Sequence, residues 1–396
     1  MTMITDTNHT GDRRRPYRIG IAGAGVGGLT AAIALQRRGN FEVVVFERAD
    51  ALSRRGAALL IWSNALLALA SIALAEEVQA ASAALDITEV RSANGDVLSR
   101  LPIGEWSEHA GAPTVVVRRP VLLDILGAAL PPGVVRLGAS LRSYELVGRG
   151  VRLLFDDGST EDVDALVGAD GLHSVVRRQL LGDAPTRDGG YDAWVGIAPI
   201  RPEGIRRAVA TATVGRGPRF WTAALRDDSV FWYATLNPRS VRTRARNQEE
   251  LCDVFRDWHS PIPELVASTP PGELIRTQIR DRAPVQEWGA GPITLLGDAA
   301  HPSTPDLGQG ACQAIESAIV MGECLNHSAS IADGFREYER SRMQRTAAIS
   351  RLCWMTAANS TVEGSLTCRL RDAAIRIGLE SVARSSLRWI LAGHQQ

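Results

Sequence analysis

The stretch Pro292–Ala318, PITLLGDAAHPSTPDLGQGACQAIESA, decides how this sequence folds. It opens on the apolar run Ile293–Leu296, which predicts a short buried strand. A loop rich in glycine and proline follows Gly297-Asp298, and from Ala311 apolar residues recur at helical spacing. A carboxylate at a strand end accepts hydrogen bonds from a sugar hydroxyl, and free N–H groups at a helix start bind an anion. The stretch therefore predicts a site for a cofactor whose ring gains negative charge on reduction.

The same residues carry a resemblance to a known family. The run Gly297-Asp298-Ala299-Ala300-His301-Pro302, followed by Pro305, Leu307-Gly308-Gln309-Gly310 and Glu316, resembles the second FAD motif of the single-component (class A) flavoprotein monooxygenases. These include salicylate, hydroxybenzoate and urate hydroxylases and zeaxanthin epoxidases. Ser317 departs from the pattern, because the family usually has Asp there. The resemblance implies FAD contacts from Asp298, Pro305, Gly308, Gln309, Gly310 and Ala311.

A second dinucleotide signal lies at the start of the chain. The sequence predicts a strand at Ile19–Ala22, a glycine turn at 23–28, a helix at Leu29–Arg38 and a strand at Val43–Phe46. In such a turn Gly23 makes the bend, Gly25 admits a pyrophosphate and Gly28 lets helix and strand approach. Glu47, at the end of the second strand, can accept a hydrogen bond from a ribose hydroxyl. The unit does not identify the dinucleotide; the second motif implies non-covalent FAD, with Val26 and Arg48 among its contacts.

Two further segments continue the resemblance. Arg119, which opens a helix with Leu122 and Leu126 on one side, matches the arginine that similar enzymes place beside the FAD phosphates and ribityl chain, and Arg118 is the competing choice. Asp170-Gly171-Leu172-His173-Ser174-Val175-Val176-Arg177 resembles the family's DG motif, which implies that Asp170 lies near FAD. An ordinary capped turn is the alternative.

The middle of the chain changes character and predicts a separate sheet. Strands are expected at Tyr191–Ile200, Ala208–Val214, Arg219–Leu225 and Val230–Leu236, with many of the chain's aromatic residues among them. The predicted fold is α/β: a Rossmann-like FAD-binding domain interleaved with a mostly antiparallel β-sheet substrate domain and followed by C-terminal helices. The expected division is a disordered leader at 1–16, an FAD-binding domain at 17–185 and 285–330, a substrate domain at 186–284 and helices at 331–396.

Catalytic candidates come from this sheet. Gly215-Arg216-Gly217-Pro218-Arg219 resembles the strand start that carries a catalytic arginine in the urate-hydroxylase branch, which implies a role for Arg219. That branch has a tyrosine on the next strand, where this chain offers Trp232 as the best match. Tyr233 lies beside it and faces the other way, since side chains alternate along a strand. A solvated surface charge is the alternative for Arg219.

Bulk composition excludes several other classes of protein. The 44 basic and 44 acidic residues cancel, which disfavours nucleic acid or anionic membrane as a partner. Five cysteines without a CxxC pair indicate neither a disulfide framework nor a metal site and suit a cytoplasmic location. The apolar stretch Gly56–Ala75 reaches the length of a membrane span, but Ser63-Asn64 divides it into a strand and a helix. We expect a monomer or homodimer that acts on a small molecule.

The motifs together define the expected activity. The resemblance implies that FAD is reduced by a transiently bound NADPH or NADH and reacts with O2, and that the resulting flavin C4a-hydroperoxide transfers one oxygen atom to a small aromatic or unsaturated substrate. Hydroxylation is favoured. Epoxidation on the same fold, an oxidase or reductase without oxygen insertion, and a flavin-dependent ligand sensor are the alternatives. The sequence contains no second GxGxxG motif, so a dedicated nicotinamide domain is not indicated.

Overall fold

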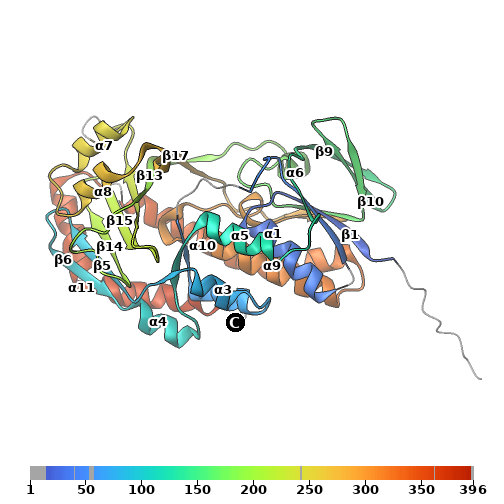
Figure 1. The fold of residues 1–396 in the computed structure, drawn as a ribbon, viewed down its shortest axis with the longest axis horizontal. Helices are drawn as coiled ribbons and strands as arrows, with labels where there is room; N and C mark the ends of the chain where they lie inside the picture. Colours follow the sequence, from blue (N-terminus) through green and yellow to red (C-terminus); the bar gives the residue numbers. More distant parts are fainter. Residues whose placement is uncertain (1–14, 40, 53–57, 241–242, 361, 394–396) are drawn as a thin grey trace, which may run out of the picture.

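The computed structural model describes residues 15–39, 41–52, 58–240, 243–360 and 362–393. The predicted leader, 1–16, lies almost wholly outside this part of the chain. Figure 1 shows two lobes side by side, one around β1 and one around β13 to β15, with long helices crossing beneath both. The predicted α/β architecture with C-terminal helices is confirmed.

The first lobe is built on a mainly parallel sheet of the dinucleotide-binding kind. Its centre is fully apolar because parallel strands are covered on both faces. The helix α1 (Val26–Arg38) packs against α9 (Gly310–His327), so the two predicted cofactor segments lie together. The strands run in the order β18 (Gly289–Ala290), β19 (Ile293–Leu295), β12 (Ala165–Gly168), β1 (Tyr17–Ala22), β2 (Phe41–Phe46) and β8 (Val135–Arg136).

Smaller elements complete this lobe. The strand β8 pairs with β2, and a separate three-stranded antiparallel sheet contains β9 (Leu141–Val147), β10 (Gly150–Phe155) and β11 (Thr160–Val163). A third sheet contains β3 (Ala58–Ile61), β7 (Val115–Arg118) and β4 (Ala83–Ala84). The helices are α2 (Ser63–Ala70), α3 (Ala75–Ala80), α4 (Ile103–Ala110), α5 (Arg119–Ala128) and α6 (Val175–Leu181).

The second lobe is a seven-stranded, mostly antiparallel sheet. Its order is β17 (Ile275–Asp281), β13 (Arg187–Ala198), β16 (Val230–Leu236), β15 (Arg219–Ala224), β14 (Val209–Val214), β5 (Ile87–Ser92) and β6 (Val97–Leu101). The hairpin β5–β6 comes from the segment assigned to the FAD-binding domain, a difference from the expected division. One face is covered by α7 (Gln248–Phe255) and α8 (Ile262–Ser268), and this pair forms its own apolar core with the sheet.

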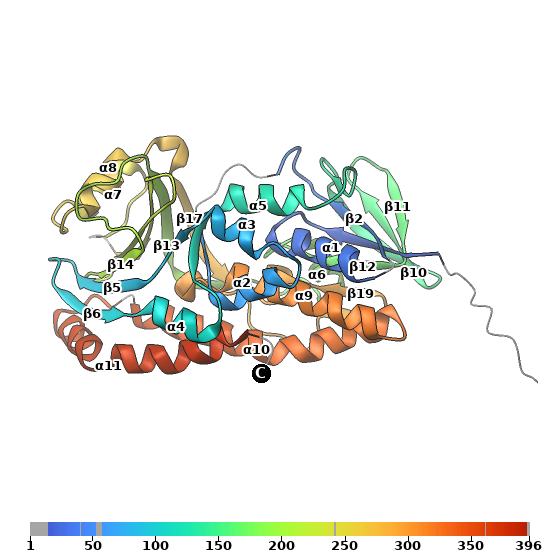
Figure 2. The ribbon, with the colours of Figure 1, turned by 60° about the horizontal axis from the view of Figure 1, so that its bottom comes forward.

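The C-terminal helices join the lobes. Figure 2 shows α10 (Ile331–Ser360) and α11 (Ser365–Leu391) along the underside, where α10 packs on α9 and α11 packs on β6 and α4. Short 3-10 turns occur at η1 (Pro271–Glu273), η2 (Gly297–Ala299) and η3 (Pro305–Leu307). The apolar stretch 56–75 contains the strand β3 and the helix α2 as predicted, but α2 begins at Ser63 after the N-cap Trp62, so Ser63 and Asn64 lie inside the helix and do not cap it. Among the described residues, no helix is both long and apolar enough to cross a bilayer.

Candidate active site

The glycine turn after β1 leaves an open space beside the start of α1. Gly23 has φ +103°, and a Cβ there would lie 2.5 Å from the Ala169 carbonyl oxygen. A Cβ on Gly28 would lie 2.0 Å from the Gly23 oxygen, whereas a Cβ on Gly25 would meet nothing within 4 Å. Two glycines are therefore required by packing, and Gly25 faces free space at the N-terminus of a helix. That arrangement suits a pyrophosphate.

Charged groups gather where β2 ends beside this turn. The Glu47 carboxylate accepts from the Ala24 N–H at 2.8 Å and from the Ala49 N–H at 3.0 Å. Arg119, at the start of α5, is half-buried; burial lowers its pKa, and the charge of Glu47 acts in the opposite direction. Arg48 is exposed next to Glu47. Arg118 instead pairs with Asp227 at 2.9 Å, so the geometry favours Arg119 for the cofactor side.

The DG segment fixes the loop that follows β19. Asp170 accepts from the Val175 N–H at 2.7 Å with one carboxylate oxygen, while its other oxygen is buried without a hydrogen-bond partner. Burial raises the pKa of this carboxyl. Arg177, on the helix that Asp170 caps, donates to the carbonyls of Ala299 and Ala300 at 2.8 and 3.2 Å. Asp170 thus caps a helix, and its free oxygen can still take a ligand donor.

Asp298 stands at the centre of that loop. It forms no hydrogen bond or ion pair with the described residues, and it is solvent-exposed. Protein atoms nevertheless surround the carboxyl closely enough to raise its pKa by desolvation. Solvent can reach a group surrounded in this way only through a recess, so Asp298 lines a recess in the folded protein. A ligand hydroxyl that entered the recess would meet an unpaired carboxylate.

The start of α9 supplies backbone donors to the same place. The first intrahelical bond joins the Gln313 N–H to the Gln309 carbonyl at 2.8 Å, so the amides of Gly310, Ala311 and Cys312 have no acceptor within the helix. A Cβ on Gly310 would meet nothing within 4 Å, and Gly308 has φ +61°. Open space therefore adjoins a cluster of free amides at the positive end of a helix dipole.

These features fit FAD. An unpaired carboxylate, an orphaned Asp170 oxygen, the gap at Gly25 and the free amides of α9 match its sugar hydroxyls, pyrophosphate and anionic reduced ring. Among the described residues, no group of three or more His, Cys, Asp or Glu side chains could hold a metal ion.

The second part of the site joins the cofactor loop to the middle sheet. The Arg219 guanidinium pairs with Asp306 at 2.8 Å and donates to the Thr235 hydroxyl at 3.0 Å. The Tyr191 hydroxyl donates to the other Asp306 oxygen at 2.6 Å. The Asp306 side chain has no exposed area, and that of Arg219 is 18% exposed. A charged, mostly buried cluster thus bridges β13, β15 and β16 to the loop before α9.

The two remaining catalytic candidates separate. Tyr233 lies on the same face of the sheet as Arg219, and its buried hydroxyl has no hydrogen-bond partner. Trp232 lies on the opposite face, where it stacks on Phe220 and donates to Thr269 at 2.8 Å. Because Trp232 is fully buried beneath α7 and α8, it cannot touch a ligand beside Arg219. The prediction of a catalytic Trp232 therefore needs correction.

Burial also limits what the two tyrosines can do. The pKa of Tyr191 is raised by burial and by the nearby Tyr233 and Asp306, while that of Tyr233 is raised by burial in spite of Arg219. Both phenols are therefore protonated at neutral pH. They can donate a hydrogen bond, and neither is a base.

Sequence reasoning missed Asp306 and Tyr191. Asp306 stands inside the opening stretch, between Pro305 and Leu307, and a carboxylate between these two residues was the available signal. Tyr191 was placed in a strand, but its contact with Asp306 joins residues far apart in the chain, which spacing alone does not reveal.

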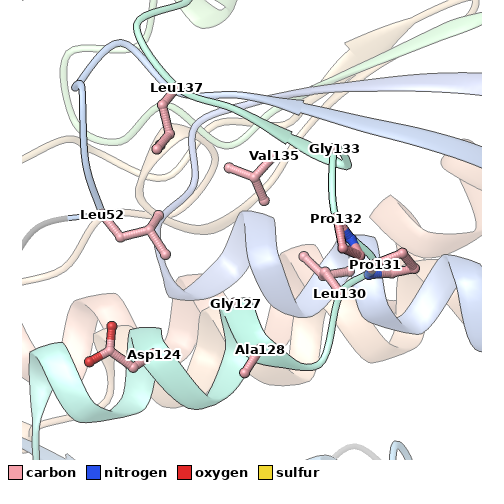
Figure 3. Close-up of a pocket in the computed structure, with 10 residues that line it drawn as sticks. All are labelled: Leu52, Asp124, Gly127, Ala128, Leu130, Pro131, Pro132, Gly133, Val135 and Leu137. Atoms are coloured by element: carbon pink, nitrogen blue, oxygen red, sulfur yellow. The ribbon is translucent and has the colours of Figure 1, made fainter.

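A surface hollow of about 380 Å³ lies elsewhere in the first lobe. Figure 3 shows it between the end of α5 and β8, with Leu52, Leu137 and Pro131 around it. None of its lining residues belongs to the glycine turn, the loop 297–310 or the middle sheet. The hollow therefore lies apart from the candidate site described above.

Comparisons with known proteins agree with this geometry. The model of the FAD binding domain family matches residues 17–352. The aurachin C monooxygenase/isomerase of Stigmatella aurantiaca is 35% identical over 358 residues, covering 90% of this chain and 93% of the relative. The 3-amino-4-hydroxybenzoate 2-monooxygenase of Streptomyces cremeus is 33% identical, covering 91% and 92%. The structure of Klebsiella pneumoniae HpxO with FAD and uric acid superposes with a TM-score of 0.87 at 26% identity, covering 95% and 96%.

Proposed function

This chain belongs to the FAD-binding-domain family of flavoprotein monooxygenases, and from that premise we propose that it hydroxylates a small, electron-rich aromatic ring with an O–H or N–H group and no carboxylate. It is an FAD-dependent monooxygenase that uses NAD(P)H and O2. Bound FAD supplies electron transfer from the nicotinamide and activation of O2. The protein's own residues bind both partners, orient them and exclude water.

The proposed FAD contacts are those that the motifs predict. Glu47 and Asp298 accept from sugar and ribityl hydroxyls, Gly25 and Val26 lie against the pyrophosphate, and Arg119 binds the phosphates. The free amides from Gly310 to Cys312 stabilise negative charge on the reduced ring. Arg177 supports this arrangement indirectly, because it holds the carbonyls beside Asp298.

The observation that carries the proposed substrate class is the charge balance of the Arg219–Asp306 cluster. One guanidinium and one carboxylate lie 2.8 Å apart, and both phenols beside them are protonated. The cluster is therefore neutral overall. A substrate carboxylate placed there would be desolvated without an unpaired cation to compensate it, which is costly.

A neutral ring with a hydroxyl or N–H group suits this cluster. Arg219, whose side chain is 18% exposed, stabilises the oxygen of a substrate hydroxyl as the hydroxyl gives up its proton, while the enclosed Asp306 carboxylate keeps the cluster neutral. Partial loss of that proton enriches the ring in electrons, which is what electrophilic oxygen transfer requires. The structure with uric acid supports a ring of this kind, because uric acid has N–H groups and no carboxylate. The relative named for 3-amino-4-hydroxybenzoate supports the electron-rich ring with amino and hydroxyl groups, although that compound also carries a carboxylate.

A matched pair of ligands tests the proposal. The FAD-loaded protein is titrated with resorcinol and with 2,4-dihydroxybenzoate, which differ only by a carboxylate, and the flavin absorbance reports binding. We expect the neutral ring to bind more tightly, and Asp306→Asn, which leaves Arg219 unpaired, to shift the preference toward the carboxylate. A wild-type protein that prefers the carboxylate tenfold, with no shift in Asp306→Asn, contradicts the proposed class.

A further inference from the structure

A buried ionic cluster lies behind the first turns of α9. Arg342, on α10, has 1% of its side chain exposed, and it pairs with the fully buried Glu316 at 2.8 Å. Arg345 reaches the same Glu316 oxygen at 3.2 Å. One carboxylate is thus shared by two guanidinium groups deep in the protein.

The two cations are not equally compensated. Arg345 also donates to the carbonyls of Trp389 and Ile390, at the negative C-terminal end of α11. Arg342 has otherwise only neutral acceptors: Gln313 at 2.6 Å and the Ser317 hydroxyl at 3.2 Å. Two guanidinium groups and one carboxylate leave the cluster with a net positive charge, and Arg342 is the cation whose acceptors other than Glu316 are neutral.

A neighbouring histidine does not change this balance. The His301 ring lies 3.1 Å from the Ser317 hydroxyl. Burial and the charge of Arg342 lower the pKa of His301 to about 3, so the ring is neutral at physiological pH. The neutral Ser317 lies between the two and compensates neither.

The cluster is connected to the cofactor side of α9. Gln313, which accepts from Arg342, donates to the Gln309 side chain at 3.0 Å, and Gln309 is the residue before the helix. Arg342 therefore lies behind the turn whose free amides adjoin the FAD recess. In a region shielded from water, its charge adds to the positive end of the helix dipole.

We propose that Arg342 acts together with the N-terminus of α9 to stabilise the anionic reduced form of bound flavin, and that neutral Ser317 leaves its charge free to do so. The inference rests on the proposed FAD site. Arg342 is a positioning residue in this scheme, since it acts through the field behind the helix and touches neither cofactor nor substrate. A carboxylate at position 317 would reach the Arg342 guanidinium and cancel its charge.

The test compares Ser317→Asp with Ser317→Asn, two side chains of equal size that differ in charge. The ratio of reduced-FAD to oxidised-FAD affinity is obtained from the midpoint potential of each FAD-loaded variant at pH 7. We expect Ser317→Asp to lower this ratio about tenfold relative to Ser317→Asn, whose ratio stays near that of the wild type. Equal ratios in the two variants overturn the inference.

A second variant covers the case in which Ser317→Asp does not fold. Gln313→Glu places a carboxylate at Gln313, which also contacts Arg342. The wild-type glutamine is a control of equal size. We expect Gln313→Glu to lower the ratio of reduced-FAD to oxidised-FAD affinity about tenfold as well. An unchanged ratio in that variant overturns the inference as well. A purely structural role would lower the melting temperature of Asp and Asn variants alike and leave the ratio unchanged. Failure of the wild-type protein to bind FAD would instead reject the proposed function.

Discussion

Two aspartates in one loop show how surroundings assign different roles to the same side chain. Asp298 is exposed and has no partner among the described residues, whereas Asp306 is buried between Arg219 and Tyr191. An unpaired carboxylate in a recess is free for an incoming ligand, and a compensated one shapes a neutral pocket. We therefore propose that Asp298 binds the cofactor and that Asp306 keeps the substrate side of the site neutral.

The first prediction concerns Asp298. Asp298→Ala should weaken FAD binding by about 1.5–3 kcal/mol, because it removes a charge-assisted hydrogen bond. Titration of the apoprotein with FAD measures the change. Asp306→Asn is the matched control from the same loop, and its FAD affinity should stay near that of the wild type. Equal losses in both variants would refute the division of roles.

The second prediction concerns Arg219. Arg219→Met should keep its FAD but bind the substrate more weakly and release more hydrogen peroxide per NAD(P)H consumed, since the Asp306 charge is left uncompensated. Flavin reduction, product and peroxide are measured separately. Arg207→Met removes an exposed arginine that pairs with Asp228, and it should change none of these. Unaltered coupling in Arg219→Met would make Arg219 a structural charge only.

At this scale the sequence indicates candidate FAD contacts more directly than candidate substrate contacts. Motif positions such as Gly23, Glu47 and Asp298 depend on local spacing, which a sequence shows directly. The Arg219–Asp306–Tyr191 cluster is made by three distant segments, so only the folded chain reveals it. The choice between Trp232 and Tyr233 depended on strand register, and cross-strand pairing places Tyr233 on the Arg219 face.

Among the elements, α9 contributes most to the proposed site, because its N-terminal amides have no acceptor within the helix and adjoin open space at Gly310. The third prediction is that Ala311→Pro lowers the flavin reduction potential. Proline is tolerated in the first turn of a helix but removes one N–H donor. Ala311→Ser keeps that amide and serves as the control. A potential that is the same in both variants, with the helix intact, would place the amides away from the ring.

The hairpin β5–β6 gives the fourth prediction. Glu89 has a side-chain exposure of only 2% and pairs with Arg91, Arg100 and Arg206. Burial alone would raise the pKa of Glu89, but the hydrogen bonds and charges of Arg91 and Arg206 outweigh it and lower the pKa from 4.5 to about 2. A pKa that is lower in the folded state contributes stability above about pH 4.5, and this is lost as the pH falls toward 2.

Glu89→Gln should therefore reduce the free energy of unfolding at pH 7 by about 1–3 kcal/mol and weaken its acid dependence below pH 4.5. Urea unfolding at several pH values measures both effects. Asp162→Asn removes an exposed ion pair with Arg152 and should have little effect. An unchanged acid dependence in Glu89→Gln would mean that the arginines do not hold this carboxylate.

Element types followed from periodicity more reliably than element partners did. Four of the seven strands of the middle sheet were predicted near their observed positions, and a helical C-terminal segment was predicted from residue 331. The pairing of β8 with β2, and of β5 with β14, was not, because pairing depends on contacts between distant segments. Short strands such as Val135–Arg136 also carry too few residues to indicate a partner.

At the scale of the whole molecule, the interleaved chain path explains how one site can serve a cofactor and a substrate. The cofactor loop leaves the first lobe and touches the middle sheet through Asp306, while α10 packs against both the loop and α9. The resemblance predicted this two-lobed plan from three motifs in order. It did not predict the Arg219–Asp306 ion pair at the junction, because this pair joins segments far apart in the chain.

The most direct test of the account is oxygen labelling. The FAD-loaded enzyme is supplied with NAD(P)H, ¹⁸O2 and the neutral hydroxyaromatic compound that binds most tightly. Mass spectrometry then measures the mass of the product. The account predicts a product that carries one ¹⁸O atom, with formation reduced in Arg219→Met although FAD stays bound. An unlabelled product, or consumption of NAD(P)H that yields only hydrogen peroxide with every such ring, would contradict it.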